Sequence, residues 1–275
     1  MKTYQITDLT FLGELVAAVA RDEIMTRFER LAFVDARQKT SAFDVVTEAD
    51  EQAEAAIGSA LRARYPGASL IGEEAAHRDP SLLSSIDSAD LAFIIDPLDG
   101  TKNFASGLPL FGVMVAVTVV GDVVAGVIHD PVQGACAYAM KGEGAWLERP
   151  DAGRIPLRVA APVPVSEMHG IVGTNFLPEP MRTQVNSRLS RLATTAWFRC
   201  AAHEYRLAAA GGVHTLFYNK LMPWDHAAGW LLHKEAGGYS GHFDGSPYRP
   251  SDAGGGLICT TDDASFHAVQ AALLE

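Results

Sequence analysis

Apolar residues near the start of the chain recur every three or four positions, which is the spacing of an amphipathic helix. Over residues 8–32 this spacing predicts a long first helix. A second helix is predicted over residues 47–64, because Thr47 and Asp50 form a capping-box pattern and Tyr65-Pro66-Gly67 ends the periodic stretch. We therefore expect two helices before the first strand.

After the second helix the pattern changes to short apolar runs separated by turn residues, which is typical of β-strands. Gly121-Asp122 interrupts the longest apolar stretch and predicts a hairpin turn. Residues 1–150 are thus expected to form an N-terminal half in which helices accompany a mostly antiparallel sheet. The strand-like runs cover residues 69–72, 91–95, 111–120, 123–128 and 135–140.

The polar segment 148–154 contains Pro and Gly and predicts a linker between two halves. Beyond it, strand-like and helical stretches alternate, which predicts an α/β C-terminal half over residues 151–275. The fold class expected for the whole chain is α/β (α+β). The expected strands cover residues 169–173, 214–218 and 256–260, and the expected helices cover residues 178–193, 203–210, 225–236 and 263–274.

Composition and charge narrow the choice of partner. The chain of 275 residues is 48% hydrophobic and 20% charged, as folded proteins are, and its net charge is -11. Such an acidic chain lacks the clustered Lys and Arg that attract a nucleic acid polymer or an anionic membrane, so a small molecule is the expected partner. We find no signal-peptide pattern, no membrane-spanning apolar run and no cysteine spacing typical of disulfides or zinc, which favours a cytoplasmic protein with buried thiols.

The most informative segment is an apolar strand that runs into the turn Asp96-Pro97-Leu98-Asp99-Gly100-Thr101. Two carboxylates three residues apart in one turn can face the same point, and the carbonyl of Leu98 can add a third oxygen ligand for Mg2+. If a helix begins after the turn, the N–H groups of Gly100 and Thr101 can bind a phosphate. Considered alone, Asp-Pro and Asp-Gly can also simply form turns.

Two further acidic elements favour a functional role for this turn. Glu73 and Glu74 follow the strand-like run 69–72, so a second strand ends in carboxylates. Asp225 begins a predicted helix whose small residues, Ala227 to Gly229, allow close approach to another backbone. Each element also has a purely structural explanation, a solvated strand end for the glutamates and a helix cap for Asp225. Together they predict a metal-binding cleft between the halves.

Three segments resemble the inositol monophosphatase family in both order and spacing. They are Gly72-Glu73-Glu74, the Asp-Pro-Leu-Asp-Gly-Thr segment from Asp96, and Trp224-Asp225-His226-Ala227-Ala228-Gly229. The resemblance covers nearly the full chain, from the segment Asp44 to Asp50 up to Gly237-Gly238. It implies a layered α-β-α-β-α sandwich, Mg2+-dependent phosphatase activity on a small phosphorylated substrate, inhibition by lithium and a homodimer.

The resemblance also implies a role for each residue of the site, with two or three Mg2+ ions bound. Asp44 would hydrogen-bond Thr101, and this pair would orient an attacking water with Glu73 as the third catalytic residue. The N–H groups of Gly100 and Thr101 would hold the phosphate. The implied metal ligands are Glu73, Asp96, the carbonyl of Leu98, Asp99 and Asp225.

On the substrate side this chain departs from the family pattern. The segment Arg199-Cys200-Ala201 replaces the Gly-Thr-Ala that contacts the inositol ring in inositol-hydrolysing members. Those members also carry a carboxylate shortly before the Trp-Asp motif, whereas residues 218–223 of this chain contain no acidic residue and include Lys220. Arg199 and Lys220 either contact a second anionic group or are surface charges. The candidate substrates are therefore inositol monophosphate or a similar small polyol phosphate, fructose 1,6-bisphosphate, histidinol phosphate and a 3′-phosphorylated nucleotide. A catalytically silent metal- and phosphate-binding regulator is disfavoured, because the implied carboxylates, Asp44 and Thr101 are all present.

Overall fold

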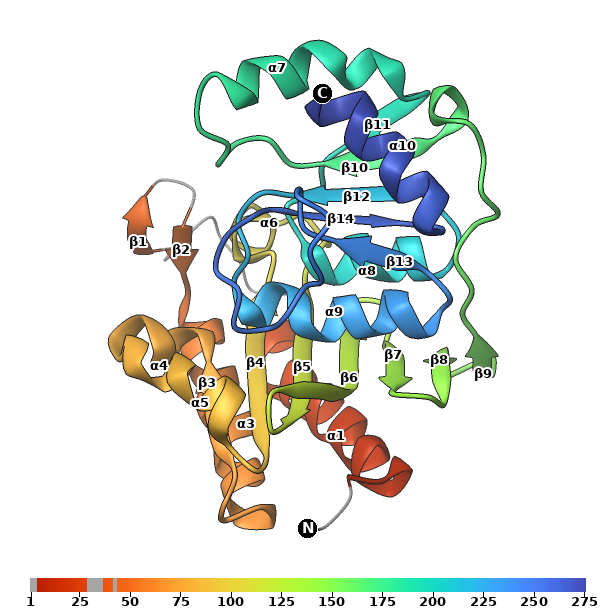
Figure 1. Cartoon of the computed structure of the whole chain (residues 1–275). Coiled ribbons are helices and arrows are strands. Elements are labelled where there is room, and N and C mark those ends of the chain that lie inside the picture. The colour runs from red at the N-terminus through yellow and green to blue at the C-terminus, as the bar shows by residue number, and fades with distance from the viewer. Residues whose placement is uncertain (1–3, 29–36, 42–43) are drawn as a thin grey trace.

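Five alternating layers of helices and sheets make up the computed structural model, which describes residues 4–28, 37–41 and 44–275 (Figure 1). Within those residues, a seven-stranded sheet and a five-stranded sheet lie on opposite sides of a central pair of helices. Further helices cover the outer face of each sheet, so the central strands of both sheets are buried on both faces. This arrangement confirms the α-β-α-β-α sandwich and the α/β (α+β) class.

The N-terminal helices cover the outer face of the larger sheet. The first is continuous to Phe28 as α1 (Ile6–Val19), a π-helical turn η1 (Ala20–Met25) and α2 (Thr26–Phe28); residues 29–32 of the predicted helix lie outside the described part. The predicted second helix is α3 (Glu48–Arg64), and its capping box forms, because the N–H of Thr47 donates to Asp50 at 2.8 Å. A small hairpin of β1 (Arg37–Ser41) and β2 (Asp44–Val46) precedes it.

The larger sheet follows the order of the chain. Its first two strands are parallel and the others pair antiparallel, as predicted. The predicted linker 148–154 instead forms the turn between the last two strands, so the boundary placed at residue 150 falls inside a hairpin. The strands are β3 (Ser69–Gly72), β4 (Ala92–Asp99), β5 (Gly112–Val119), β6 (Asp122–Asp130), β7 (Ala135–Met140), β8 (Gly144–Arg149) and β9 (Gly153–Pro156).

Burial on both faces explains why the central strands read as unbroken apolar runs. In β5, Val113, Val115 and Val117 pack toward α1 and α3, whereas Met114 and Ala116 pack toward the central helices. A strand with one solvated face would instead alternate apolar and polar residues. The sheet is therefore an interior layer that can present functional groups only at its strand ends.

The central layer consists of α8 (Ala201–Ala209) and α9 (Pro223–Glu235), which pack against each other and against the larger sheet. Beyond it lies the smaller sheet, in the order β11-β10-β12-β14-β13, covered by α7 (Met181–Arg188) and α10 (Asp263–Leu274). The pattern missed β11 and β13, which have only three residues each. The strands are β10 (His169–Val172), β11 (Thr194–Ala196), β12 (Thr215–Tyr218), β13 (Tyr239–Gly241) and β14 (Leu257–Thr260).

Short helical turns connect these elements. They are α4 (Glu73–Arg78), η2 (Pro80–Ser84), α5 (Ser85–Ser88), α6 (Thr101–Ala105), η3 (Val165–Glu167) and η4 (Leu189–Arg191). None of the helices in the described part of the chain is both long and apolar enough to cross a membrane.

Close contact between α8 and α9 depends on Gly229. A Cβ atom at this position would lie 2.0 Å from Cδ2 of the Tyr205 ring, which is fully buried. We expect Gly229→Ala to lower the free energy of unfolding by about 1–3 kcal/mol, the usual range for overpacking a core. Urea denaturation measures this change. Gly67→Ala is the matched control, since a Cβ there meets no atom within 4 Å; equal stability losses in the two variants would contradict the packing explanation.

Candidate metal and phosphate site

Three chain segments meet at one pocket of about 210 Å³. Because β3 and β4 are parallel and Gly72 pairs with Ile95, the residues that follow this pair, Glu73 and Asp96, are neighbours at the end of β3. Glu73 begins α4, whereas Asp96 is still paired with Met114 of β5. The first turn of α9 supplies Asp225 from the central layer. Among the residues whose side chains the structure describes, the pocket lining includes every sequence-predicted one. They are Glu73, Asp96, Leu98, Asp99, Gly100, Thr101, Arg199, Cys200, Ala201, Lys220 and Asp225.

The turn between β4 and α6 has an irregular backbone. The pairing of β4 with β5 shifts register between Asp96 and Asp99, and the N–H of Leu98 donates to Asp96 Oδ1 at 3.0 Å. Gly100 then takes a positive φ of 86°, and a Cβ there would lie 2.7 Å from the carbonyl oxygen of Leu110. Glycine is therefore required at this position. The helix α6 starts at Thr101, as expected.

The buried carboxylates of the pocket resist ionisation. Burial, followed by the charges of Glu73 and Asp99, raises the pKa values of both Asp96 and Asp225 well above the usual range. Burial also raises the pKa of Asp99 to about 6, although the N–H of Ala202 opposes the shift. Several acids crowded in one dry pocket repel one another unless cations or protons neutralise them.

The donor set suits a hard cation, since carboxylates and one backbone carbonyl are the oxygen ligands that Mg2+ prefers. Among the described residues, no group of three or more His, Cys, Asp or Glu side chains is arranged to hold a metal ion as it stands. One oxygen of Asp99, Oδ2, is already engaged by the N–H of Ala202 at 2.6 Å. The ligand assignment to Glu73, Asp96, Asp99 and Asp225 therefore stays a prediction supported by their chemistry and shared pocket.

Thr101 has a buried partner that the sequence analysis did not name. Its hydroxyl lies 2.9 Å from Asp50 Oδ1, toward which it can donate, and 2.9 Å from the carbonyl oxygen of Leu98. Asp50 is buried, and burial raises its pKa to about 7. The sequence interpretation paired Thr101 with Asp44, whose side chain lies outside the described ones, and used Asp50 only as part of a capping box. A contact across 51 positions leaves no local signal, so spacing alone did not find it.

A second carboxylate missed by the sequence analysis holds the segment that follows β3. Glu54, on α3, accepts the N–H groups of Glu74 and Ala75 at 2.7 Å and 2.9 Å. These N–H groups lie in the first turn of α4, where the backbone donors have no acceptor within the helix and a nearby negative charge is favourable. Glu54 therefore fixes the start of the helix that carries Glu73 into the pocket.

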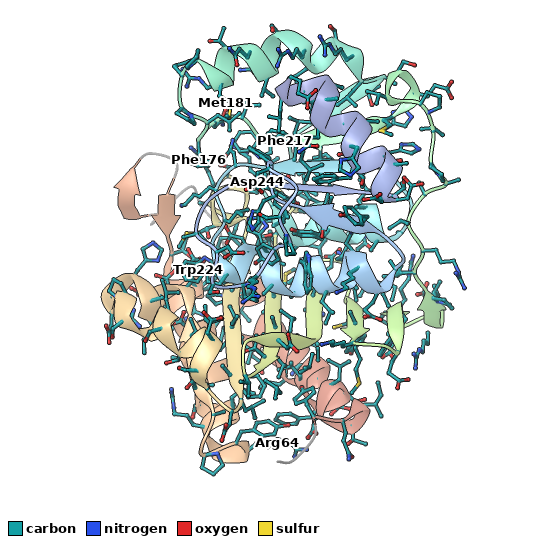
Figure 2. All side chains as sticks on the ribbon, viewed as in Figure 1. Arg64, Phe176, Met181, Phe217, Trp224 and Asp244 are labelled. Carbon is teal, nitrogen blue, oxygen red and sulfur yellow. The ribbon has the colours of Figure 1, made fainter. Side chains whose placement is uncertain are left out.

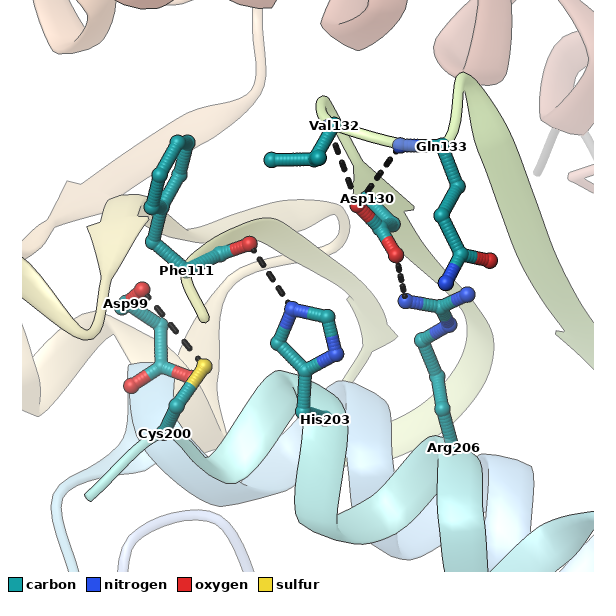
Figure 3. A network of polar contacts seen from close by, with 8 residues as sticks. All are labelled: Asp99, Phe111, Asp130, Val132, Gln133, Cys200, His203 and Arg206. Carbon is teal, nitrogen blue, oxygen red and sulfur yellow. Dashed lines mark hydrogen bonds and ion pairs between the residues drawn. The ribbon is translucent and has the colours of Figure 1, made fainter. Parts of the chain in front are cut away.

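Polar contacts three residues apart along α8 fasten this helix to the larger sheet (Figure 3). Cys200 Sγ donates to Asp99 Oδ2 at 3.1 Å, and His203 Nε2 donates to the carbonyl of Phe111 at 3.0 Å. Farther along, Arg206 forms an ion pair of 2.8 Å with the buried Asp130. Cys200 thus acts on the site through Asp99, and His203 makes a structural contact rather than serving as a free base.

Aromatic side chains at the pocket mouth also gave no signal in the sequence. Phe176 and Trp197 line the pocket and remain 50% and 39% exposed. Figure 2 shows Phe176 and Trp224 on the left side of the molecule, with Trp224 at the start of α9 and Phe176 above it. Phe176 and Trp197 lie outside helices and strands, so no periodic sequence pattern predicts their position. They give the entrance an apolar surface next to its charged groups.

Comparison with known proteins identifies the class of this site. The model of the inositol monophosphatase family matches residues 6–274, nearly the whole chain. The chain belongs to the inositol monophosphatase family. Members of this family are phosphatases and generally depend on metal ions, which agrees with a pocket lined by several carboxylates. The resemblance seen in three short motifs is thereby confirmed.

Individual relatives support this membership. The Nus factor SuhB of Haemophilus influenzae is 35% identical over 243 residues, which cover 86% of this chain and 85% of the relative. The solved structure of the Thermotoga maritima IMPase has a TM-score of 0.80 and 26% identity and covers 97% of both chains. SaIMPase-II, solved with inositol monophosphate bound, has a TM-score of 0.78 and 20% identity, covers 97% of this chain and 94% of its own, and shows the shared fold alone.

Proposed function

We propose that this inositol monophosphatase family member is a cytoplasmic, Mg2+-dependent phosphomonoesterase that hydrolyses inositol monophosphate or a similar small polyol phosphate. The observation that carries the proposal is the convergence of four carboxylates with the turn of Gly100 and Thr101 in one pocket. An acidic pocket would repel a phosphate unless bound cations reversed its charge. The inositol monophosphate bound to SaIMPase-II, a protein of the same fold, is a substrate of the kind proposed.

Each residue has a distinct task in the proposed hydrolysis. Glu73, Asp96, Asp99, Asp225 and the Leu98 carbonyl would hold two or three Mg2+ ions. When bound, these ions supply the positive charge that neutralises the phosphoryl and leaving oxygens. The N–H groups of Gly100 and Thr101 bind the phosphate. The attacking water forms the new P–O bond as the ester P–O bond breaks, and the products are an alcohol and inorganic phosphate.

The pair of Asp50 and Thr101 is proposed to orient the attacking water. A Thr101 hydroxyl that donates to Asp50 keeps a lone pair free to accept a hydrogen bond from the water. The water proton can then pass through this hydroxyl to Asp50, the buried acceptor behind it. The role that the family resemblance implies for Asp44, whose side chain lies outside the described ones, stays a prediction beside this proposal for Asp50.

Phosphate release from a panel of inositol, sugar, histidinol and nucleotide phosphates tests the proposal. We expect release that requires Mg2+, stops with EDTA and is inhibited by Li+. Mg2+ should also raise the melting temperature, because ions that bind only the folded site stabilise it. A folded, Mg2+-binding protein that releases phosphate from no compound would instead support the silent regulator. Light scattering tests the homodimer that the family membership suggests.

A second candidate function follows from the relatives, since proteins 35% identical to this chain are named Nus factor SuhB. Such a role would depend on a protein surface rather than on the pocket. Expression of the Asp96→Asn variant in cells that lack the native protein distinguishes the factor role from the phosphatase function. Full rescue of growth by this pocket variant would favour the factor role, and failure of rescue would favour the phosphatase.

A further inference from the structure

Arg199 has an unusual backbone conformation at the edge of the pocket. Its φ is 56°, in the left-handed region that glycine adopts freely and residues with a Cβ adopt rarely. Only Val120 shares this feature among the non-glycine residues that the structure describes. A side chain held in a disfavoured conformation at a pocket is reason to look for a function of that side chain.

The surrounding contacts hold the turn in place on both sides of Arg199. The N–H of Phe198 donates to Oε1 of the buried Glu204 at 2.9 Å. The carbonyl oxygen of Phe198 accepts a hydrogen bond from Nδ2 of the buried Asn103 at 2.8 Å. After the turn, the N–H of Ala202 donates to Asp99. The backbone on either side of Arg199 is thus held by Asn103 of α6, Glu204 of α8 and Asp99 at the end of β4.

Most N–H donors of the Arg199 guanidinium make no hydrogen bond within the described part of the chain. One nitrogen, Nη2, donates to the neutral Asn103 Oδ1 at 2.9 Å. A guanidinium carries five N–H donors, and no carboxylate within the described part of the chain pairs with it. The side chain lines the pocket only half-buried, so its remaining donors can reach a ligand.

Lys220 places a second positive charge at the same pocket. Its ammonium lies 5.4 Å from the ring centre of Phe176 and forms no ion pair with the carboxylates that the structure describes. The carbonyl of Lys220 accepts from His226 Nε2 at 2.9 Å, which ties its backbone to α9. The positive charge of Lys220 opposes the rise of the pKa of Asp225, which lines the same pocket. Neither Lys220 nor Arg199 forms an ion pair within the described part of the chain, so both can still bind an anionic ligand.

We propose that Arg199 and Lys220 bind a second anionic group on the substrate, a phosphate or a carboxylate on the leaving alcohol. This inference rests on the proposed phosphatase function, and it changes the favoured substrate from inositol monophosphate to phosphomonoesters that carry two anionic groups. A neutral leaving group such as inositol leaves both charges unused. A cationic leaving group such as histidinol is repelled by them.

Matched pairs of substrates test the second anion site. Adenosine 3′,5′-bisphosphate is compared with adenosine 3′-phosphate, and fructose 1,6-bisphosphate with fructose 1-phosphate, by kcat/KM at saturating Mg2+. The wild-type protein should prefer the bisphosphate in at least one pair. Arg199→Gly should reduce that preference roughly tenfold to hundredfold, as expected for loss of hydrogen bonds to a charged group, and Lys220→Met should reduce it several-fold.

The controls distinguish a binding role from a structural one. Arg199→Gly suits the local φ, Arg199→Lys should restore part of the preference, and Arg158→Gly removes an exposed arginine that does not line the pocket. No preference for either bisphosphate, or the same preference in wild type and Arg199→Gly, overturns the inference. If wild type hydrolyses no compound, the phosphatase function fails. Calorimetry then measures binding of the same pairs to the wild-type and Arg199→Gly proteins. Tighter binding of a bisphosphate that is lost in Arg199→Gly would support the anion site independently of hydrolysis, and equal binding would overturn it.

Discussion

The Asp96→Asn substitution should nearly abolish phosphate release and at the same time stabilise the metal-free protein. Asp96 is assigned as the ligand shared by two metal ions, so turnover should fall at least about a thousandfold, the upper range for losing one electrostatic contact in an active site. Stability at neutral pH should rise because burial and the charges of Glu73, Asp99 and Asp225 raise the pKa of Asp96 in the folded state. A carboxyl that ionises less readily in the folded than in the unfolded protein destabilises the fold at neutral pH, and asparagine does not titrate. Asparagine Oδ1 can still accept the N–H of Leu98.

Phosphate release with Mg2+ and thermal unfolding in EDTA measure the two effects. A gain in melting temperature of roughly 2–6 °C is expected, corresponding to relief of one or two kcal/mol in a protein of this size. Glu74→Gln is the control, because Glu74 does not line the pocket, and it should cost less than Asp96→Asn. A folded Asp96→Asn protein with wild-type turnover would exclude the two-metal assignment.

The Asp50→Asn substitution should lower kcat roughly a hundredfold or more, within the range for loss of a general acid-base group. Asp50 accepts the N–H of Thr47 at one oxygen and contacts the hydroxyl of Thr101 at the other. An amide has only one acceptor oxygen, so one of the two contacts must be lost or reversed. Steady-state kinetics, with circular dichroism to verify folding, measure the effect.

Two comparisons decide whether Asp50 acts with Thr101. Asp44→Asn should cost much less than Asp50→Asn, and the opposite order would restore the role that the family resemblance suggested for Asp44. The double variant Asp50→Asn with Thr101→Val should lose little more than the worse single variant, because residues that act as one unit are not additive. Fully additive losses would show that the two residues work independently.

The sequence predicted the parts of the fold that have strong local patterns. The capping box of α3 and the apolar run of β4 each place one element, and the structure confirms both. The strand β9 was missed because all of its residues are exposed, so its composition matches that of a linker. Edge strands lack the buried side chains that make a strand visible in a sequence.

The candidate site could be predicted only where its residues lie on one segment or in a known motif. The turn from Asp96 to Thr101 contains two carboxylates, a backbone carbonyl and a glycine within six consecutive residues, so the sequence alone indicated its residues. Asp50 and Glu54 act across tertiary contacts with Thr101 and Glu74, and Trp197 lies on an irregular segment. Their roles depend on how layers pack, and no spacing along the chain encodes that.

The position of Asp225 in the first turn of a core helix has a consequence for how related proteins can diverge. An insertion or deletion in α9 would rotate its buried face out of contact with the larger sheet and move the carboxylate as well. We therefore expect length changes among homologues to be excluded from residues 96–101 and 223–235. Changes of substrate should instead accumulate in the segments around Phe176, Arg199 and Lys220, which can alter without shifting the core.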